Sequence, residues 1–318
     1  MAKKIKKTKK FFFVLGSFCV GCIITLYNAF PGILERYFQK KTYRKVGLEI
    51  KAMAVGKDII EYVEGGKGQT ILFIHGFQGD KNSWMPYTKR LSSYHKVVAI
   101  DLPGHGGSSF PSNQNYDIQS LAEAVNRFVE EKKIGPFHLV GTSMGGGIST
   151  VYASKYPQKL LSLTLINPLG VNMTEKSDLL KKMEEGKNLL FPENLSDFDE
   201  FSTFLTGHPL PINQYFKRYA LKKMLKKRPF YQKVFSELIK SKTVETLLPQ
   251  ISTRTLLLMG GRDRVLHPSS YKIYEEKLPN ALSKRIKEGS HVFCGPYFEE
   301  ALNTMICFFS EPVVAREE

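Results

Sequence analysis

The motif Gly141-Thr142-Ser143-Met144-Gly145 constrains the fold more than any other feature of this 318-residue chain. The residues before it are predicted to form a strand and those after it a helix. In a G-x-S-x-G motif with this context, a sharp turn exposes the serine hydroxyl, and glycines flank it because side chains would collide there. Without the context, the same residues would form an ordinary Gly/Ser turn. Ser143 is therefore the candidate nucleophile.

The chain around this motif alternates short β-branched or aromatic runs with helical patterns, which is typical of a mostly parallel sheet covered by helices on both faces. Five helices are predicted at 84–91, 118–132, 144–155, 268–277 and 296–309. Eight strands are predicted at 48–54, 58–64, 70–75, 96–101, 136–142, 161–167, 254–260 and 284–288, and the first two could form an antiparallel hairpin. The sequence thus predicts an α/β fold with an eight-stranded sheet.

The alternation stops between residues 172 and 248. This stretch contains helical patterns at 178–187, 197–205 and 212–226, separated by Pro192, Pro209, Pro211 and Pro229. It is too long for a loop between two strands. We expect a helical cap, or lid, inserted into a core formed by residues 48–171 and 249–312.

A serine nucleophile needs a base, and the chain has seven histidines. Only His267 and His291 lie downstream of Ser143 at predicted strand ends, where side chains converge on one edge of the sheet. His267 precedes Pro268 at a predicted helix start, so we interpret it as structural and His291 as the base. Asp263 follows a predicted strand and is the candidate carboxylate that orients the histidine and stabilises its cation. Alternatively, Asp263 is a turn residue or pairs with a flanking arginine.

The oxyanion formed during acyl transfer needs two backbone donors. One candidate is the N–H of Met144, at the start of a helix. The other is the N–H of Phe77, in the loop after the third strand. We expect His75, in the same loop, to hold that loop in place.

The N-terminus combines a basic tail with an apolar segment. Six lysines lie in residues 1–10, and residues 11–30 carry no charge. Twenty helical residues span about 30 Å, the thickness of a bilayer's hydrocarbon core. We therefore predict an uncleaved single-pass anchor at 11–30, a linker at 31–47, and a catalytic body on the extracytoplasmic side. A cleaved signal peptide and lipidation at Cys22 are the alternatives.

Net charge is +16, but the excess is local. Residues 1–45 contain eleven Lys/Arg and one acidic residue, and residues 216–242 contain ten and one. Two basic patches in an otherwise slightly acidic chain argue against a nucleic-acid partner. Aromatic residues lie among the lysines of the second patch, which suggests either contact between the cap and anionic lipid or a solvated Lys-rich helix.

These motifs resemble the α/β-hydrolase fold superfamily, serine hydrolase branch. The resemblance rests on the segments 75–77, 101–106 and 141–146 together with Asp263 and His291, and it covers about residues 48–310. With the N-terminal span, the chain is most similar to membrane-anchored monoacylglycerol lipases of the α/β-hydrolase-domain group. The resemblance implies a helical cap over the active site.

We therefore expect a membrane-anchored serine carboxylic ester hydrolase acting on monoacylglycerol or a similar lipid ester, with no metal or organic cofactor. The substrate-binding residues are not predicted. A carbon–carbon bond hydrolase of the meta-cleavage type, which would use the same triad, and a non-catalytic interaction protein on the same fold remain alternatives.

Overall fold

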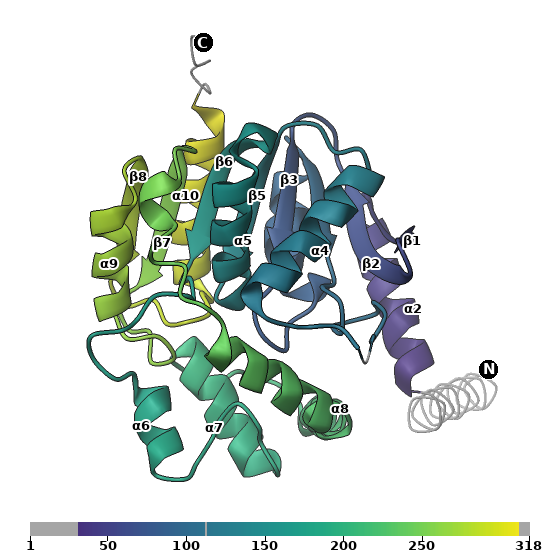
Figure 1. Cartoon of the computed structure of the whole chain (residues 1–318). Helices are drawn as coiled ribbons and strands as arrows, with labels where there is room; N and C mark the ends of the chain where they lie inside the picture. Colours follow the sequence, from purple (N-terminus) through teal and green to yellow (C-terminus); the bar gives the residue numbers. More distant parts are fainter. Residues whose placement is uncertain (1–30, 112, 312–318) are drawn as a thin grey trace, which may run out of the picture. The chain divides into compact units, whose positions relative to one another are not determined.

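An eight-stranded sheet dominates the computed structural model, which describes residues 31–111 and 113–311 (Figure 1). The strands are β1 (Leu48–Val55), β2 (Asp58–Gly65), β3 (Thr70–Ile74), β4 (Lys96–Ile100), β5 (Phe137–Thr142), β6 (Leu160–Ile166), β7 (Thr255–Gly260) and β8 (Ala281–Ile286).

The strands follow the order β1-β2-β4-β3-β5-β6-β7-β8. Strands β3 to β8 pair in parallel with their neighbours, whereas β2 pairs antiparallel with β4. This confirms the predicted mostly parallel sheet. Because parallel strands end at the same edge, the loops after β3, β5, β7 and β8 are brought to one side of the sheet.

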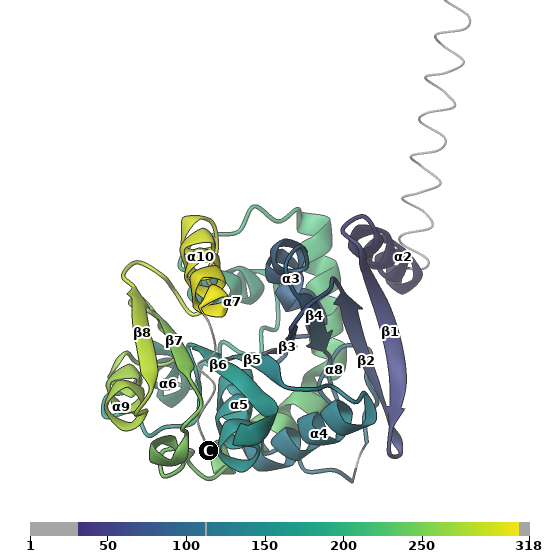
Figure 2. The same ribbon diagram turned by 90° about the horizontal axis from the view of Figure 1, so that it is seen from above.

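Helices cover both faces of the sheet, as predicted. Helices α3 (Met85–Leu91) and α10 (Pro296–Ser310) lie on one face, and α4 (Ile118–Glu131) and α5 (Met144–Lys155) lie on the other (Figure 2). The helical spacing of apolar residues in α4 explains its placement, since Leu121, Val125 and Phe128 are all buried.

The burial of a strand explains how accurately its bounds were predicted from the sequence. Every residue of β7 is buried, because helices cover both of its faces, and its sequence is an apolar run. The edge strand β8 exposes four consecutive residues, Leu282 to Arg285. The predicted start of this strand, residue 284, was wrong by three residues because an exposed edge strand lacks the apolar pattern on which the prediction relied.

The segment 172–248 contains α6 (Asp178–Glu184), α7 (Leu195–Thr206) and α8 (Gln214–Lys240), and no strand among its described residues. Its backbone bonds to loops at the carboxyl edge of the sheet: Leu179 N donates to Arg264 O at 3.1 Å, and Leu205 O accepts from Val292 N at 2.9 Å. The three helices therefore lie over that edge (Figure 1).

Helix α8 differs from the prediction, which ended it at Lys226 before Pro229. The helix runs for 27 residues and continues through Pro229. Pro229 is exposed, whereas Tyr231, Val234 and Leu238, which follow it in the helix, are buried. Burial of this apolar face compensates for the backbone hydrogen bond that proline cannot make.

The described residues divide into two compact units, with the boundary after Ile50. In the first, helix α2 (Pro31–Arg44) occupies most of the segment predicted as a linker, and Gln39 Nε2 donates to Glu35 Oε1 at 3.1 Å. The predicted anchor at 11–30 lies outside the described residues. Among the helices of the described ranges, none is both long and apolar enough to cross a bilayer.

Candidate active site

Ser143 occupies the turn between β5 and α5. Its φ is +53° and its ψ is −120°, a conformation that L-residues rarely adopt. A Cβ at Gly141 would lie 2.2 Å from Gly145 O, and one at Gly145 would lie 2.2 Å from Ile74 O. Both flanking glycines are thus required by close backbone approach, and the geometry agrees with the turn predicted from the motif.

Asp263 and His291 are directly hydrogen bonded. His291 Nδ1 lies 2.7 Å from Asp263 Oδ2, and both residues are buried. An ionised carboxylate can only accept, so Nδ1 donates and Nε2 is the ring nitrogen that can take up a proton. Asp263 Oδ1 accepts from the backbone N–H groups of Val265 and Leu266 at 2.8 and 3.0 Å. These bonds fix the carboxylate against the histidine ring.

The sheet brings the three predicted residues to one edge, since Ser143, Asp263 and His291 follow β5, β7 and β8. No hydrogen bond joins the Ser143 and His291 side chains among the described residues. The end of β6 connects their segments instead: Ser143 N donates to Ile166 O at 3.0 Å, and Asn167 Nδ2 donates to His291 O at 2.8 Å.

Asn167 was not predicted as a site residue. It is fully buried and has a φ of +43°, which asparagine tolerates better than most residues. Its Oδ1 accepts from Gly260 N at 2.7 Å, so one side chain joins the ends of β6 and β7 to the histidine loop. Its position directly after an apolar run is the signal that the sequence offers.

The loop predicted to supply an oxyanion donor passes beside Ser143. A Cβ at Gly76 would lie 3.2 Å from Ser143 Cβ and 3.8 Å from its Oγ. The Phe77 ring packs against Phe191, Tyr231 and Phe235 of the 172–248 segment. Met144, the residue after Ser143, begins α5, where first-turn N–H groups have no partner within the helix. The loop of Phe77 thus approaches Ser143 closely, and the oxyanion roles of Phe77 and Met144 stay predictions.

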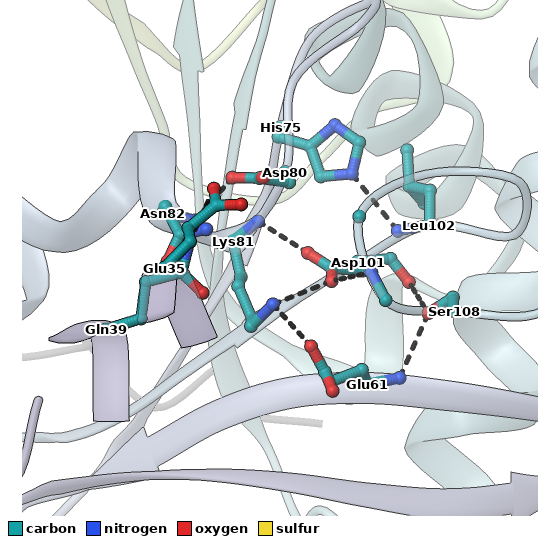
Figure 3. A network of polar contacts seen from close by, with 12 residues as sticks. Glu35, Gln39, Glu61, His75, Asp80, Lys81, Asn82, Asp101, Leu102 and Ser108 are labelled. Carbon is teal, nitrogen blue, oxygen red and sulfur yellow. Dashed lines mark hydrogen bonds and ion pairs between the residues drawn. The ribbon is translucent and has the colours of Figure 1, made fainter. Parts of the chain in front are cut away.

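A buried charge cluster joins this loop to the loop after β4 (Figure 3). Lys81 Nζ lies 2.7 Å from Glu61 Oε1 and 2.8 Å from Asp101 Oδ2. Lys81 N donates to Asp101 Oδ1 at 2.6 Å. His75 Nε2 accepts from Leu102 N at 3.1 Å, which agrees with the predicted role of His75 in holding the loop. The loops after β3 and β4 are thus tied together below the site.

Burial and neighbouring charges shift the pKa values of Lys81 and Asp101 in opposite directions. Burial by itself would lower the pKa of Lys81, but the Asp101 and Glu61 carboxylates raise it above its usual value. Burial raises the pKa of Asp101 although the Lys81 charge opposes the rise. Burial lowers the pKa of His75, and it lowers the pKa of His105 to about 3. Both histidines are therefore neutral near pH 7.

Replacing Lys81 with methionine should leave Glu61 and Asp101 buried without their shared cation. We expect a loss of about 3–5 kcal/mol in the free energy of unfolding, measured by denaturant titration. The matched control is Lys89→Met, which changes an exposed lysine on α3. Equal stabilities for the two variants would contradict a supporting role for the cluster.

An elbow serine after a parallel strand and a downstream carboxylate–histidine pair define the class of serine hydrolases. Residues 69–295 match the family described as the alpha/beta hydrolase fold, and the chain belongs to this family. The resemblance stated from the motifs is thus confirmed.

Named lipases and a phospholipase are similar to this chain over most of its length. Monoacylglycerol lipase abhd6-B of Xenopus laevis is 29% identical over 265 residues, which cover 79% of each protein. A solved membrane phospholipase A, described as a bacterial virulence factor, is 32% identical with a TM-score of 0.84, covering 93% of this chain and 97% of that one. A putative lipase from Acinetobacter baumannii is 27% identical with a TM-score of 0.77, covering 86% and 95%.

Proposed function

We propose that this enzyme hydrolyses carboxylic esters of lipids, with monoacylglycerols as the leading substrate class, through an acyl-enzyme on Ser143. The observation that carries the proposal is the buried Asp263–His291 pair at the sheet edge that also presents Ser143. The names of the similar proteins, a monoacylglycerol lipase, a phospholipase A and a putative lipase, support an ester as substrate.

Each residue has a defined part in the proposed reaction. His291 Nε2 takes the Ser143 hydroxyl proton as Oγ attacks the acyl carbonyl, and Asp263 stabilises the resulting imidazolium. The Phe77 and Met144 N–H groups donate to the oxyanion. His291 then protonates the departing alcohol, leaving the acyl group on Ser143 Oγ. A water molecule, deprotonated by His291, attacks the acyl-enzyme. The bond to Ser143 Oγ breaks, His291 returns the proton to that oxygen, and the fatty acid is released.

The test is a chain-length series of monoacylglycerols assayed beside p-nitrophenyl esters. We expect fatty acid release, with a preference for monoacylglycerol over short soluble esters. A carbon–carbon bond hydrolase would instead turn over a meta-cleavage dienoate without cleaving these esters. A non-catalytic interaction protein would turn over none of the compounds.

The contacts of the 172–248 segment support a cap that encloses the site. Three hydrogen bonds join it to loops of the sheet edge: Gln78 Nε2 donates to Leu190 O at 2.9 Å, Leu179 N donates to Arg264 O, and Val292 N donates to Leu205 O. These three bonds lie beside Phe77, Asp263 and His291 respectively. Substrate would therefore enter between the cap and the sheet edge.

We further propose that the enzyme is held at a membrane by the 11–30 anchor, with the body on the extracytoplasmic side. The support is the uncharged twenty-residue run after six lysines. Removing residues 1–30 should make the body extractable without detergent while it still cleaves soluble esters. Retention of the shortened chain in the membrane fraction would count against this segment as the anchor.

Exposed residues of α8 suggest a second membrane contact. Tyr215, Phe216 and Leu225 are 37%, 55% and 41% exposed. Exposed lysines 222, 223 and 226 lie on the same helix. Apolar and basic side chains exposed together are typical of a helix that lies against anionic lipid. Lys227 differs: it is half-buried, and its Nζ lies 4.5 Å from the Phe110 ring centroid.

Changing Lys222, Lys223 and Lys226 together to glutamate should therefore lower activity on anionic vesicles, since each lysine near such a surface contributes about 1 kcal/mol. Activity on a water-soluble ester should not change. The matched control reverses three exposed lysines of the core, Lys57, Lys89 and Lys287. If both triple variants behave alike on vesicles, the cap lysines form an ordinary solvated face.

A further inference from the structure

Tyr271 is a buried residue of helix α9 (Ser269–Lys277), and it touches the proposed catalytic pair. Its hydroxyl lies 2.8 Å from Asp263 Oδ2, the same oxygen that accepts from His291 Nδ1 at 2.7 Å. The side chain is fully buried. We propose that Tyr271 is a positioning residue that fixes Asp263 and moderates the negative charge that His291 experiences.

The hydrogen bonds of Asp263 leave its carboxylate no freedom to rotate. Oδ1 accepts from two backbone N–H groups, and Oδ2 accepts from Tyr271 and His291. Rotation about the terminal torsion would break bonds at both oxygens. Tyr271 thus holds the same carboxylate oxygen that orients the histidine ring.

The Tyr271 hydroxyl has a single proton and two neighbouring acceptors, Asp263 Oδ2 at 2.8 Å and Asn167 Oδ1 at 3.1 Å. The proton goes to Asp263, because that oxygen is charged and nearer, and Asn167 Oδ1 already accepts from Gly260 N. Asn167 in turn holds the His291 backbone through its Nδ2. Tyrosine, asparagine, aspartate and histidine therefore form one connected frame.

The tyrosine acts as a donor at any working pH. Burial, and next the adjacent Asp263 charge, raise the pKa of Tyr271 far above its usual value, so the phenol keeps its proton. A hydroxyl that donates to a carboxylate withdraws charge from the accepting oxygen. Asp263 then stabilises the imidazolium of His291 less strongly, and His291 gives up its proton more readily to a departing alcohol.

Several charged groups on the loops and helices around this frame pair with one another. Ion pairs at or near the surface join Arg262 to Glu288, Arg264 to Asp178, Lys272 to Glu276, Arg285 to Glu275 and Lys277 to Glu245. His267 lies 3.9 Å from Glu175. Within the described ranges, Tyr271 provides the side-chain hydroxyl that is hydrogen bonded to the pair, which makes its removal a specific perturbation.

The experiment compares Tyr271→Phe with Tyr274→Phe. Both tyrosines are buried on α9, but the Tyr274 hydroxyl donates to Leu169 O at 3.0 Å instead of Asp263. We expect Tyr271→Phe to move the acid limb of the kcat/KM profile to higher pH by about half a unit to one unit. Tyr274→Phe should leave it in place. A merely structural role for Tyr271 would lower activity without moving this limb.

The inference rests on the proposed function, so a second measurement separates the two. In a Ser143→Ala background, the NMR titration midpoint of His291 should shift upward with Tyr271→Phe, whether or not any ester is cleaved. A shift without ester hydrolysis by the unaltered enzyme would refute the function and keep the positioning role. An unchanged midpoint, or equal shifts in both tyrosine variants, would overturn the positioning role.

A variant that preserves the hydroxyl covers the case in which Tyr271→Phe does not fold. Site-specific replacement of Tyr271 by 3-fluorotyrosine adds little volume and makes the phenol a stronger donor. The acid limb and the His291 midpoint should then move to lower pH, opposite to the phenylalanine variant. No movement, or movement to higher pH, would overturn the proposal.

Discussion

Replacing Ser143 with alanine is expected to abolish covalent labelling by a fluorophosphonate probe and to lower kcat by about five to six orders of magnitude. The hydroxyl removed is the one that the β5–α5 turn exposes. Alanine keeps the Cβ, so the strain of a φ of +53° is the same in both proteins and the fold should persist. Labelling is measured on gels, and the fold is checked by thermal unfolding.

The matched control is Ser154→Ala, which removes a hydroxyl from the same helix beyond its first turns. This variant should label and turn over like the unaltered enzyme. A Ser143→Ala protein that still labels fully would place the nucleophile elsewhere and remove the basis of the proposed mechanism.

The parts of this molecule that the sequence predicts well are those in which neighbouring residues carry the information. The predicted bounds of α5, 144–155, agree with the structure because five consecutive residues specify the turn before it. The bounds of β7 agree to one residue because its apolar run is buried on both faces. Local patterns failed where tertiary packing decides the outcome, as in α8, which continues through Pro229 because its far half buries an apolar face.

The supporting residues of the site could not be predicted because their partners are distant in the sequence. Lys81 meets Asp101 twenty residues away, and Asn167 meets His291 at a separation of 124. A lone lysine or asparagine gives no sign that it will be buried. By contrast, Asp263 and His291 could be proposed without contacts, since the strand pattern places both at the same edge.

Lys227 of α8 shows what a basic composition leaves undecided. Composition does not distinguish Lys222, Lys223 and Lys226, which are exposed, from Lys227. Lys227 instead turns inward, where its Nζ approaches Gly106 O at 3.4 Å, and burial followed by the nearby Lys223 charge lowers the pKa of Lys227. Net charge therefore shows where a basic patch lies in the chain but not which of its members face solvent.

The second large loss of activity is expected when His291 or Asp263 is replaced. His291→Ala and Asp263→Asn should each lower kcat by about four orders of magnitude or more. Without His291 no group takes the Ser143 proton. With asparagine at 263, the amide can donate to Nδ1 and stabilise the wrong tautomer, in which Nε2 carries the proton and cannot accept another. Initial rates on a soluble p-nitrophenyl ester measure both effects.

Combining either change with Ser143→Ala should lower kcat little further, because the three side chains act as one unit and the residual rate comes from the oxyanion donors and substrate binding. His267→Ala is the matched control, since His267 also follows β7 but its side chain approaches Glu175 instead of a site residue. If His267→Ala removed activity while His291→Ala kept it, the base would be His267. If the losses of kcat in the double variants were the product of the single losses, Asp263 and His291 would act independently of Ser143. The structure argues against that result, because a 2.7 Å hydrogen bond joins Asp263 and His291 at the sheet edge that also carries Ser143.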